Sequence, residues 1–283
     1  MQFTKAHGLG NDFILIDAFT TENIQVEDWG GSAKKACDRN FGIGADGLVI
    51  IEKSDVADLK MRIFNSDGTE PEMCGNAIRC VAGYVYQHKL ITKKKITVET
   101  KAGILVPEII ESSNRNHYVK VEMGEPILEP IKIPVNLDQD LTKVVNYPLE
   151  VNGNIIHITC VSMGNPHCVV FVSVITDELI TSLGPILEKH PIFPNKTNVE
   201  FVEVIDSEHL KMRVWERGAG PTLACGTGAC AALVAAKLNN VATNKAVIHL
   251  AGGDLEIEWA DSNKIYMTGP AVEVFTGDFP NET

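Results

Sequence analysis

The sequence has no apolar run that approaches the roughly 20 residues a membrane-spanning helix needs. It opens on MQFTKAHGLGNDF, without the basic start and apolar stretch of a signal peptide. Basic residues are also few, since 25 Lys and Arg stand against 37 Asp and Glu, giving a net charge of −12. Nucleic-acid surfaces need clustered Lys and Arg. We therefore expect no membrane contact and no nucleic-acid partner.

Several ligand-binding motifs are missing as well. The seven cysteines form no CxxC pair and match no common zinc spacing, so no metal site is expected. Their odd number, without an export signal, favours reduced thiols in a cytoplasmic protein. The chain contains no G-x-x-x-x-G-K-[ST] loop, and GIGADG (42–47) precedes a predicted strand where a dinucleotide fingerprint must follow one.

The chain does contain an internal repeat. MRIF begins thirteen residues before Cys74, and MRVW begins thirteen residues before Cys225, so the copies are 151 residues apart (225 − 74). GLVIIE (47–52) and NVEFVE (198–203) keep the same offset. Internal self-similarity of this kind indicates repeated structural units.

The repeat predicts two equivalent domains. We expect residues 1–124 to form the first and 125–269 the second, with 270–283 returning as a strand on the first. Each half contains several short β-rich runs and few helices, which is typical of an α+β fold with largely antiparallel sheets. GNAIRCVAGYVY and GTGACAALVAAKL are apolar nearly all round, as buried helices are. We predict two pseudo-symmetric domains, each a mostly antiparallel sheet curled around a central helix.

Both predicted central helices begin directly after a cysteine, Cys74 in one half and Cys225 in the other. The first turn of a helix has unpaired N–H groups and partial positive charge, which lowers the pKa of a thiol and binds carboxylates. Two such helix starts would direct two thiols at one cleft. One cysteine, as the thiolate, could remove an amino acid's α-proton while the other, as the thiol, returns a proton from the opposite face, as a coupled pair.

Four motifs carry a family resemblance. HGLGNDFILID, MCGNAIRC, SMGNPHCVVF and ERGAGPTLACGTGACAA closely resemble diaminopimelate epimerase, a family of racemases and epimerases that use no pyridoxal phosphate. The likeness covers essentially the whole chain. It implies cofactor-free conversion of LL- to meso-diaminopimelate, for lysine and peptidoglycan synthesis, by two similar domains that each wrap a sheet around a helix. It also implies a small-molecule substrate and a homodimer.

The resemblance further implies roles by motif. Cys74 and Cys225 would be the acid/base pair, with His167 and Glu216 near the thiols. The backbone that holds the reacting carboxylate would come from Gly75, Asn76, Gly226 and Thr227. The substrate-recognition set would be Asn11, Asn65, Asn165, Asn198 and Arg217, with Arg217 suited to the distal carboxylate and Glu216 and Arg217 also contacting the reacting amine. Some members carry Gln at the position of Gly47, where water or backbone is expected to take that role.

Three other functions fit parts of the pattern. A related cofactor-free racemase acting on proline would use the same chemistry, although Arg217 and the asparagines suit a second amino-acid head group better. A cysteine hydrolase would pair one cysteine with His167 and leave the other cysteine unexplained. A redox or binding protein would join Cys74 and Cys225 in a switchable disulfide.

Overall fold

The computed structural model describes residues 1–21, 26–137 and 141–279. The chain forms two compact units: Met1–Glu122 with Thr268–Thr283 make unit 1, and Met123–Met267 make unit 2. Both junctions lie two residues before those expected from the repeat, at 122/123 and 267/268 in place of 124/125 and 269/270. Residues 280–283 of the expected returning strand lie outside the described residues.

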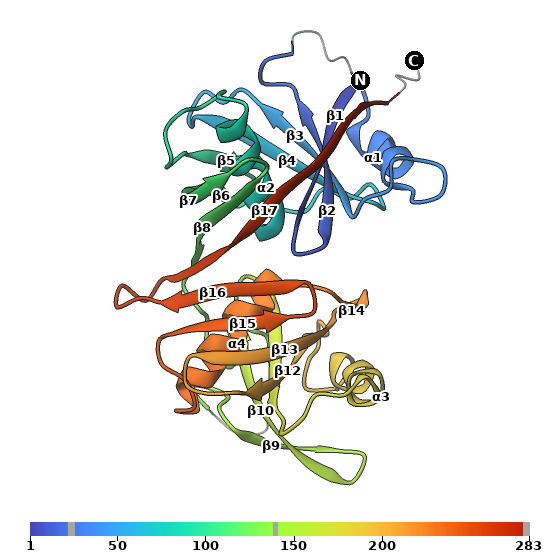
Figure 1. The fold of residues 1–283 in the computed structure, drawn as a ribbon. Helices are drawn as coiled ribbons and strands as arrows, with labels where there is room; N and C mark the ends of the chain where they lie inside the picture. Colours follow the sequence, from blue (N-terminus) through green and yellow to red (C-terminus); the bar gives the residue numbers. More distant parts are fainter. Residues whose placement is uncertain (22–25, 138–140, 280–283) are drawn as a thin grey trace. The chain divides into compact units, whose positions relative to one another are not determined.

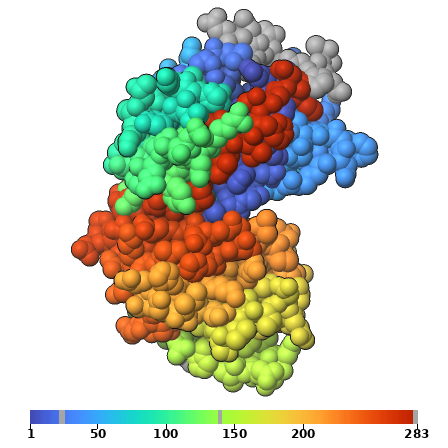
Figure 2. Space-filling view, viewed as in Figure 1, coloured from blue at the N-terminus to red at the C-terminus, as the bar shows by residue number. Residues whose placement is uncertain are grey.

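Unit 1 begins with strands and alternates them with two helices (Figure 1). Its elements are β1 (Gln2–Gly8), β2 (Asn11–Asp17), α1 (Trp29–Cys37), β3 (Gly47–Glu52), β4 (Leu59–Asn65), α2 (Gly75–Gln87), β5 (Val98–Thr100), β6 (Gly103–Leu105), β7 (Glu108–Ser113) and β8 (Asn116–Gly124). The long strand β17 (Ile265–Asp278) pairs antiparallel with β1 from Gln2↔Asp278 to His7↔Val272 and also pairs with β8. The C-terminal strand therefore runs between the first strand and β8 (Figure 2).

Unit 2 repeats this order. Its elements are a 3₁₀ turn (Pro130–Lys132), β9 (Tyr147–Val151), β10 (Asn154–Ser162), β11 (Pro166–Phe171), α3 (Asp177–Glu188), β12 (Asn198–Val204), β13 (His209–Glu216), β14 (Gly220–Thr222), α4 (Gly226–Leu238), β15 (Lys245–Leu250) and β16 (Gly253–Trp259). Helices α2 and α4 have 13 residues each, and their first residues are 151 apart (226 − 75). The predicted α+β fold, with mostly antiparallel sheets, is confirmed by the architecture.

Parallel pairing occurs where a helix connects two strands. In unit 1, β2 pairs parallel with β3 across α1, and β4 with β5 across α2. In unit 2, β11 pairs parallel with β12 across α3, and β13 with β15 across α4. A parallel connection needs a crossover segment, which a helix usually provides. The sequence did not predict these parallel pairs, because which strands become neighbours depends on the tertiary fold.

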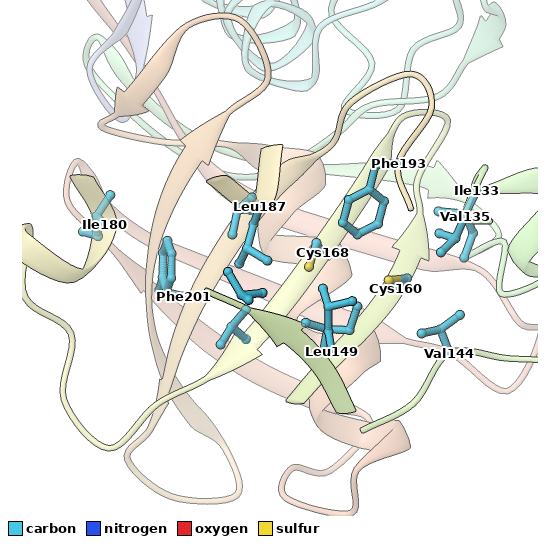
Figure 3. Packing of buried hydrophobic residues seen from close by; sticks show 14 residues of the cluster. Ile133, Val135, Val144, Leu149, Cys160, Cys168, Ile180, Leu187, Phe193 and Phe201 are labelled. Atoms are coloured by element: carbon cyan, nitrogen blue, oxygen red, sulfur yellow. The ribbon is translucent and has the colours of Figure 1, made fainter. Parts of the chain in front are cut away.

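Helices cover the sheet strands from both sides. In unit 2, α4 contacts β10 through β13 together with β15 and β16, and its residues 228–236 are buried. The other side of β10, β11 and β12 packs against α3, in a core that includes Cys160, Cys168, Phe201 and Leu187 (Figure 3). Strands buried on both faces lack the polar/apolar alternation of a half-exposed strand. GLVIIE is a nearly continuous apolar run for this reason, whereas NVEFVE also carries the buried Glu200.

Unit 1 is built in the same way. Helix α2 contacts β1, β2, β4 and β7, and nine of its residues are buried. Helix α1 packs Ala33, Ala36 and Cys37 against β2 and β3. No helix in the described part of the chain is long and apolar enough to cross a membrane.

Candidate active site

Cys74 is the residue that starts helix α2. Its backbone is extended (φ −141°, ψ 120°), as N-cap residues are, and the helix begins at Gly75. The Cys74 thiol donates to Oδ1 of Asn11 over 3.9 Å, and Nδ2 of Asn76 donates to the same oxygen over 2.9 Å. The β1–β2 turn and the start of α2 therefore meet at Oδ1 of Asn11. This contact brings together four predicted residues: Cys74, Gly75, Asn76 and Asn11.

Asn11 is held from its other end by a carboxylate. Its Nδ2 donates to Oδ2 of Asp46 over 2.7 Å, so the orientation of its amide is fixed. Asp46 in turn accepts from Arg39, which also pairs with Asp12. This ionic network lies at the base of the β1–β2 turn, and the sequence patterns did not predict it, because its members are spread over 35 residues (46 − 11).

Arg79 supports the start of α2 from inside the unit. The side chain is fully buried. Its guanidinium donates to the carbonyl of Gly75 over 3.2 Å and to Oδ1 of Asn76 over 2.9 Å. It also reaches the carbonyl of Pro270. Arg79 was visible in the sequence as the one charged residue of an apolar helix, but the patterns assigned it no role.

Asn65 and Gly47 lie opposite each other at the end of β4 and the start of β3. Nδ2 of Asn65 donates to Oγ1 of Thr69 over 3.0 Å, inside its own turn. Gly47 is buried, and a Cβ there would lie 3.0 Å from the carbonyl oxygen of Phe64. A larger residue at position 47 would need the neighbouring strand to move by a few tenths of an ångström.

Cys225 starts helix α4 in unit 2. Its backbone is again extended (φ −125°, ψ 109°), and its sulfur accepts from the N–H of Gly228 over 3.4 Å. Oγ1 of Thr227 lies 3.6 Å from the same sulfur. Cys225 is 7% exposed. Its sulfur therefore lies in the first turn of α4, against a backbone N–H and a hydroxyl.

Burial raises the pKa of the Cys225 thiol well above its usual value, and the carboxylates of Glu216 and Glu200 raise it further. Hydrogen bonds from Thr227 and Gly228 act in the opposite direction but are outweighed. The expectation that a helix start lowers the thiol pKa is therefore wrong for Cys225, because desolvation and two anions outweigh the helix N-terminus. Burial and the two carboxylates thus favour the thiol form of Cys225 over the thiolate.

His167 lies beside this helix start, in β11. Its Nε2 is 2.9 Å from Oδ1 of Asn165, and its Nδ1 is 2.6 Å from Oε1 of Glu200. Nδ2 of Asn165 donates to Oγ1 of Thr227 over 3.3 Å. The predicted residues His167, Asn165, Thr227 and Cys225 are thus joined by side-chain contacts. Glu200, which completes the set, was not predicted.

Glu216, Arg217 and Asn198 form the adjacent corner of unit 2. Oδ1 of Asn198 accepts from the backbone N–H of Arg217 over 2.9 Å, and its Nδ2 donates to the carbonyl of Pro166 over 2.9 Å. Glu216 accepts from the hydroxyl of Thr222. The guanidinium of Arg217 is exposed and donates to the carbonyl of Asn195 over 3.2 Å. Asn198 therefore fixes where the Arg217 backbone turns away from β13.

Neither a disulfide bond nor a group of three or more His, Cys, Asp and Glu suited to a metal ion occurs among the residues that the structure describes. Each unit places a thiol at a helix start. Amide groups and a more distant carboxylate surround the start of α2 in unit 1, and amide, carboxylate and imidazole groups surround the start of α4 in unit 2.

Comparison with known proteins adds to this geometry. The family model for diaminopimelate epimerase matches residues 3–129 and 159–274. The chain is 53% identical over 283 residues to the diaminopimelate epimerase of Pelotomaculum thermopropionicum, covering 100% of both chains. It is 55% identical over 279 residues to that of Acetivibrio thermocellus, covering 98% of each.

The fold also matches a solved structure of low identity. A probable proline racemase from Agrobacterium radiobacter superposes with a TM-score of 0.69 at 14% identity, covering 99% of this chain and 93% of that one. Likeness at this identity concerns the fold alone. The family-model match and the full-length relatives establish the family. The chain belongs to the diaminopimelate epimerase family, as its motifs predicted.

Proposed function

We propose that this chain converts LL-diaminopimelate to meso-diaminopimelate without a cofactor, with Cys74 and Cys225 as the acid/base pair. The observation that carries the proposal is the repeated placement of a cysteine at the N-cap of a buried 13-residue helix, once in each unit. Inverting a carbon centre needs two proton-transfer groups, one for each face, and the repeat supplies two equivalent ones.

The proton transfers follow from this pairing. A thiolate removes the α-proton, and the electron pair left on the α-carbon spreads into the carboxylate as an enolate-like anion. The second thiol then delivers its proton to the opposite face and becomes the thiolate, so the two cysteines exchange roles with each turnover. Because burial and nearby carboxylates keep Cys225 protonated, the first thiolate in the LL-to-meso direction comes from Cys74.

Backbone N–H groups at the two helix starts stabilise the developing charge. Gly75, Asn76, Gly226 and Thr227 supply these groups, and oriented dipoles of this kind usually provide the largest share of the rate enhancement. Asn11, Asn65, Asn165 and Asn198 would recognise the substrate, with Arg217 on the distal carboxylate. Glu216 and Arg217 would contact the amine, and Gly47 would leave room for water or backbone.

The geometry of His167 speaks against the cysteine-hydrolase alternative. Both of its ring nitrogens are engaged, one by Glu200 and the other by Asn165. A hydrolase base needs one nitrogen directed at the nucleophilic sulfur. In the proposed epimerase His167 acts on Cys225 indirectly, through Asn165 and Thr227.

The proposal extends to the setting of the reaction. We place the enzyme in the cytoplasm, in lysine and peptidoglycan synthesis, as a homodimer acting on a small molecule. Membership of the diaminopimelate epimerase family supports this setting. Light scattering coupled to gel filtration would test the oligomeric state, since a monomer at micromolar concentration would contradict the homodimer.

Isotope exchange tests the reaction itself. Reduced protein is incubated with LL-diaminopimelate in deuterated water without any added cofactor. We expect meso-diaminopimelate that carries deuterium at the inverted α-carbon. Cys74→Ala and Cys225→Ala should each abolish the conversion while circular dichroism shows the fold retained. Near-normal turnover by either variant would rule out the two-cysteine scheme.

A further inference from the structure

Glu200 is a fully buried carboxylate on β12. Its Oε1 lies 2.6 Å from Nδ1 of His167, while its Oε2 is buried and finds no hydrogen-bond partner among the residues that the structure describes. Buried carboxylate oxygens are normally hydrogen-bonded, so the placement of Glu200 calls for an explanation from its surroundings. The contacts of its other oxygen, Oε1, provide one.

The hydrogen bonds around His167 fix where its protons are. Oδ1 of Asn165 can only accept, so Nε2 of His167 carries a proton that it donates there. A second proton lies between Nδ1 and Oε1 of Glu200. His167 and Glu200 thus form a fully buried imidazole–carboxylate pair, with Glu200 as its acidic end.

The same chain of contacts continues to the sulfur. Because Oδ1 of Asn165 faces His167, its Nδ2 faces Thr227 and donates to Oγ1. Oγ1 then accepts from Asn165, so the hydroxyl proton of Thr227 is available for the Cys225 sulfur 3.6 Å away. Glu200 therefore orients each donor between itself and the Cys225 sulfur, namely His167, Asn165 and Thr227.

The carboxylate of Glu200 also lies against the first turn of α4. A Cβ added to Gly228 would lie 2.8 Å from Oε1 of Glu200 and 3.2 Å from the Cys225 sulfur. The carboxylate and the sulfur thus flank the same glycine. The absence of a side chain at position 228 is what allows this approach.

The equivalent positions in unit 1 are apolar. The pair His167↔Asn198 of β11 and β12 corresponds to Phe13↔Gly47 of β2 and β3. At the offset of 151, Glu200 corresponds to Val49 (200 − 151), which is buried. The dyad of His167 and Glu200 is therefore an addition to one half of the repeat.

We propose that Glu200 is a positioning residue for the reaction: it orients the His167–Asn165–Thr227 chain so that the Thr227 hydroxyl donates to Cys225, and its negative charge keeps Cys225 a thiol between turnovers. This inference rests on the proposed function, in which Cys225 returns the proton. The groups that face Cys225 are Glu200 on β12, Glu216 on β13 and His167 on β11, and burial and both carboxylates favour the thiol.

The test measures thiol ionisation directly. Cys225 and Cys74 are labelled by short pulses of methyl methanethiosulfonate across a pH series and quantified by peptide mass spectrometry. In Glu200→Gln the amide still bonds to the imidazole, but the negative end of the pair is gone. We expect the Cys225 labelling midpoint to fall by about half a pH unit or more, with the Cys74 midpoint unchanged.

A second variant should act in the opposite direction. Thr227→Val keeps the shape of the side chain and removes the hydroxyl donor, so the Cys225 midpoint should rise. Glu203→Gln is the matched control, because residue 203 lies on the opposite face of β12 from residue 200. It should leave the midpoint where it is in the unmodified protein. An unmoved Cys225 midpoint in either Glu200→Gln or Thr227→Val would overturn the proposal.

Kinetics give an independent readout. Glu200→Gln should lower kcat about tenfold and leave KM within about twofold, because the residue does not touch substrate. It should also shift the pH–rate profile in the direction of the labelling midpoint. An unchanged kcat would overturn the role in the reaction. Failure of the proposed function would appear instead as absent deuterium exchange in the unmodified protein, which the labelling experiment does not depend on.

Discussion

The guanidinium of Arg79 donates to the backbone carbonyl of Pro270 over 3.2 Å, joining helix α2 to a strand 191 residues further along the chain. The same side chain bonds to Gly75 and Asn76 at the start of the helix. One buried side chain therefore holds the first turn that carries Cys74 against the C-terminal strand. This link explains why a charged residue occurs in an otherwise apolar helix.

Replacing Arg79 should destabilise unit 1. Arg79→Met keeps most of the apolar volume but removes the donors to Gly75, Asn76 and Pro270, of which only Asn76 is buried. We therefore expect the free energy of unfolding to fall by about 2 kcal/mol. Arg79→Lys should recover part of this loss, since an ammonium reaches fewer of the acceptors. Urea denaturation followed by circular dichroism measures both. Equal stability of the Met variant and the unmodified protein would contradict the role.

Asp12 should contribute to the acid sensitivity of the fold. Burial alone would raise the pKa of Asp12, but hydrogen bonds from Arg39 and Lys5 hold it at about 2. A lowered carboxyl pKa stabilises the folded state above the unfolded-state value near 4, and this contribution is lost as the pH falls towards 2. We expect it to amount to about 1–2 kcal/mol. Asp12→Asn should therefore flatten the stability profile between these pH values, measured by urea titration at each pH.

The position of a cysteine in the fold should determine whether its replacement affects epimerisation. Cys37 is buried against β2 and β3, and burial raises the pKa of its thiol to about 11. Cys37→Ala should keep kcat within about twofold and lower stability by about 1 kcal/mol, as small core truncations do. Cys74→Ala should lose measurable epimerisation. If the Cys37 variant lost activity to the same extent, the effect of the Cys74 variant could not be assigned to catalysis.

Glu188 should tune substrate affinity through the loop that follows β13. Its Oε1 accepts from the N–H of Gly218 over 3.1 Å and its Oε2 from the indole of Trp215 over 2.9 Å. Glu188→Ala removes both anchors beside Arg217, so KM for diaminopimelate should rise about three- to tenfold with a smaller change in kcat. Glu188→Gln keeps an acceptor for Gly218 and should lie in between. Steady-state kinetics that showed a fall in kcat alone would be inconsistent with this assignment.

Gly228→Ala should disturb the site with little change to the helix. Alanine favours a helix by about 1 kcal/mol over glycine, but its Cβ would lie 2.8 Å from Oε1 of Glu200 and 3.2 Å from the Cys225 sulfur. Both neighbours are buried, so the carboxylate or the sulfur must shift to make room for it. We expect kcat to fall at least about tenfold. The melting temperature should change far less than it would for a clash of equal size in the hydrophobic core. An unaltered kcat would show that the carboxylate can move aside.

Much of the fold could be predicted from the sequence. The 151-residue offset and the apolar segments after Cys74 and Cys225 indicated two similar units, each with a buried helix, and the structure contains both helices with equal lengths. These features depend on residues close together in the chain. Strand β1 was not predicted, and its pairing with β17 depends on a segment more than 260 residues away in the sequence, although its other partner, β2, follows it directly.

The site was predicted less completely. Glu200 stands in NVEFVE, where a polar residue in an apolar run is expected to face solvent, yet it is fully buried beside α4. Its partner His167 is 33 residues away and meets it because β11 and β12 pair in parallel. The lowered pKa expected for Cys225 was also wrong, since burial and the positions of Glu216 and Glu200 could not be known from neighbouring residues.

The sequence by itself determined the repeated units, the helices that begin at Cys74 and Cys225, and the family, because local periodicity and short motifs encode them. Tertiary structure decided which charges lie against each sulfur. Arg79 supports one helix start and Glu200 the other, and both side chains act across contacts between segments that are far apart in the chain. Electrostatic interactions depend on distance in space and on burial, and neither can be predicted from the order of the residues alone.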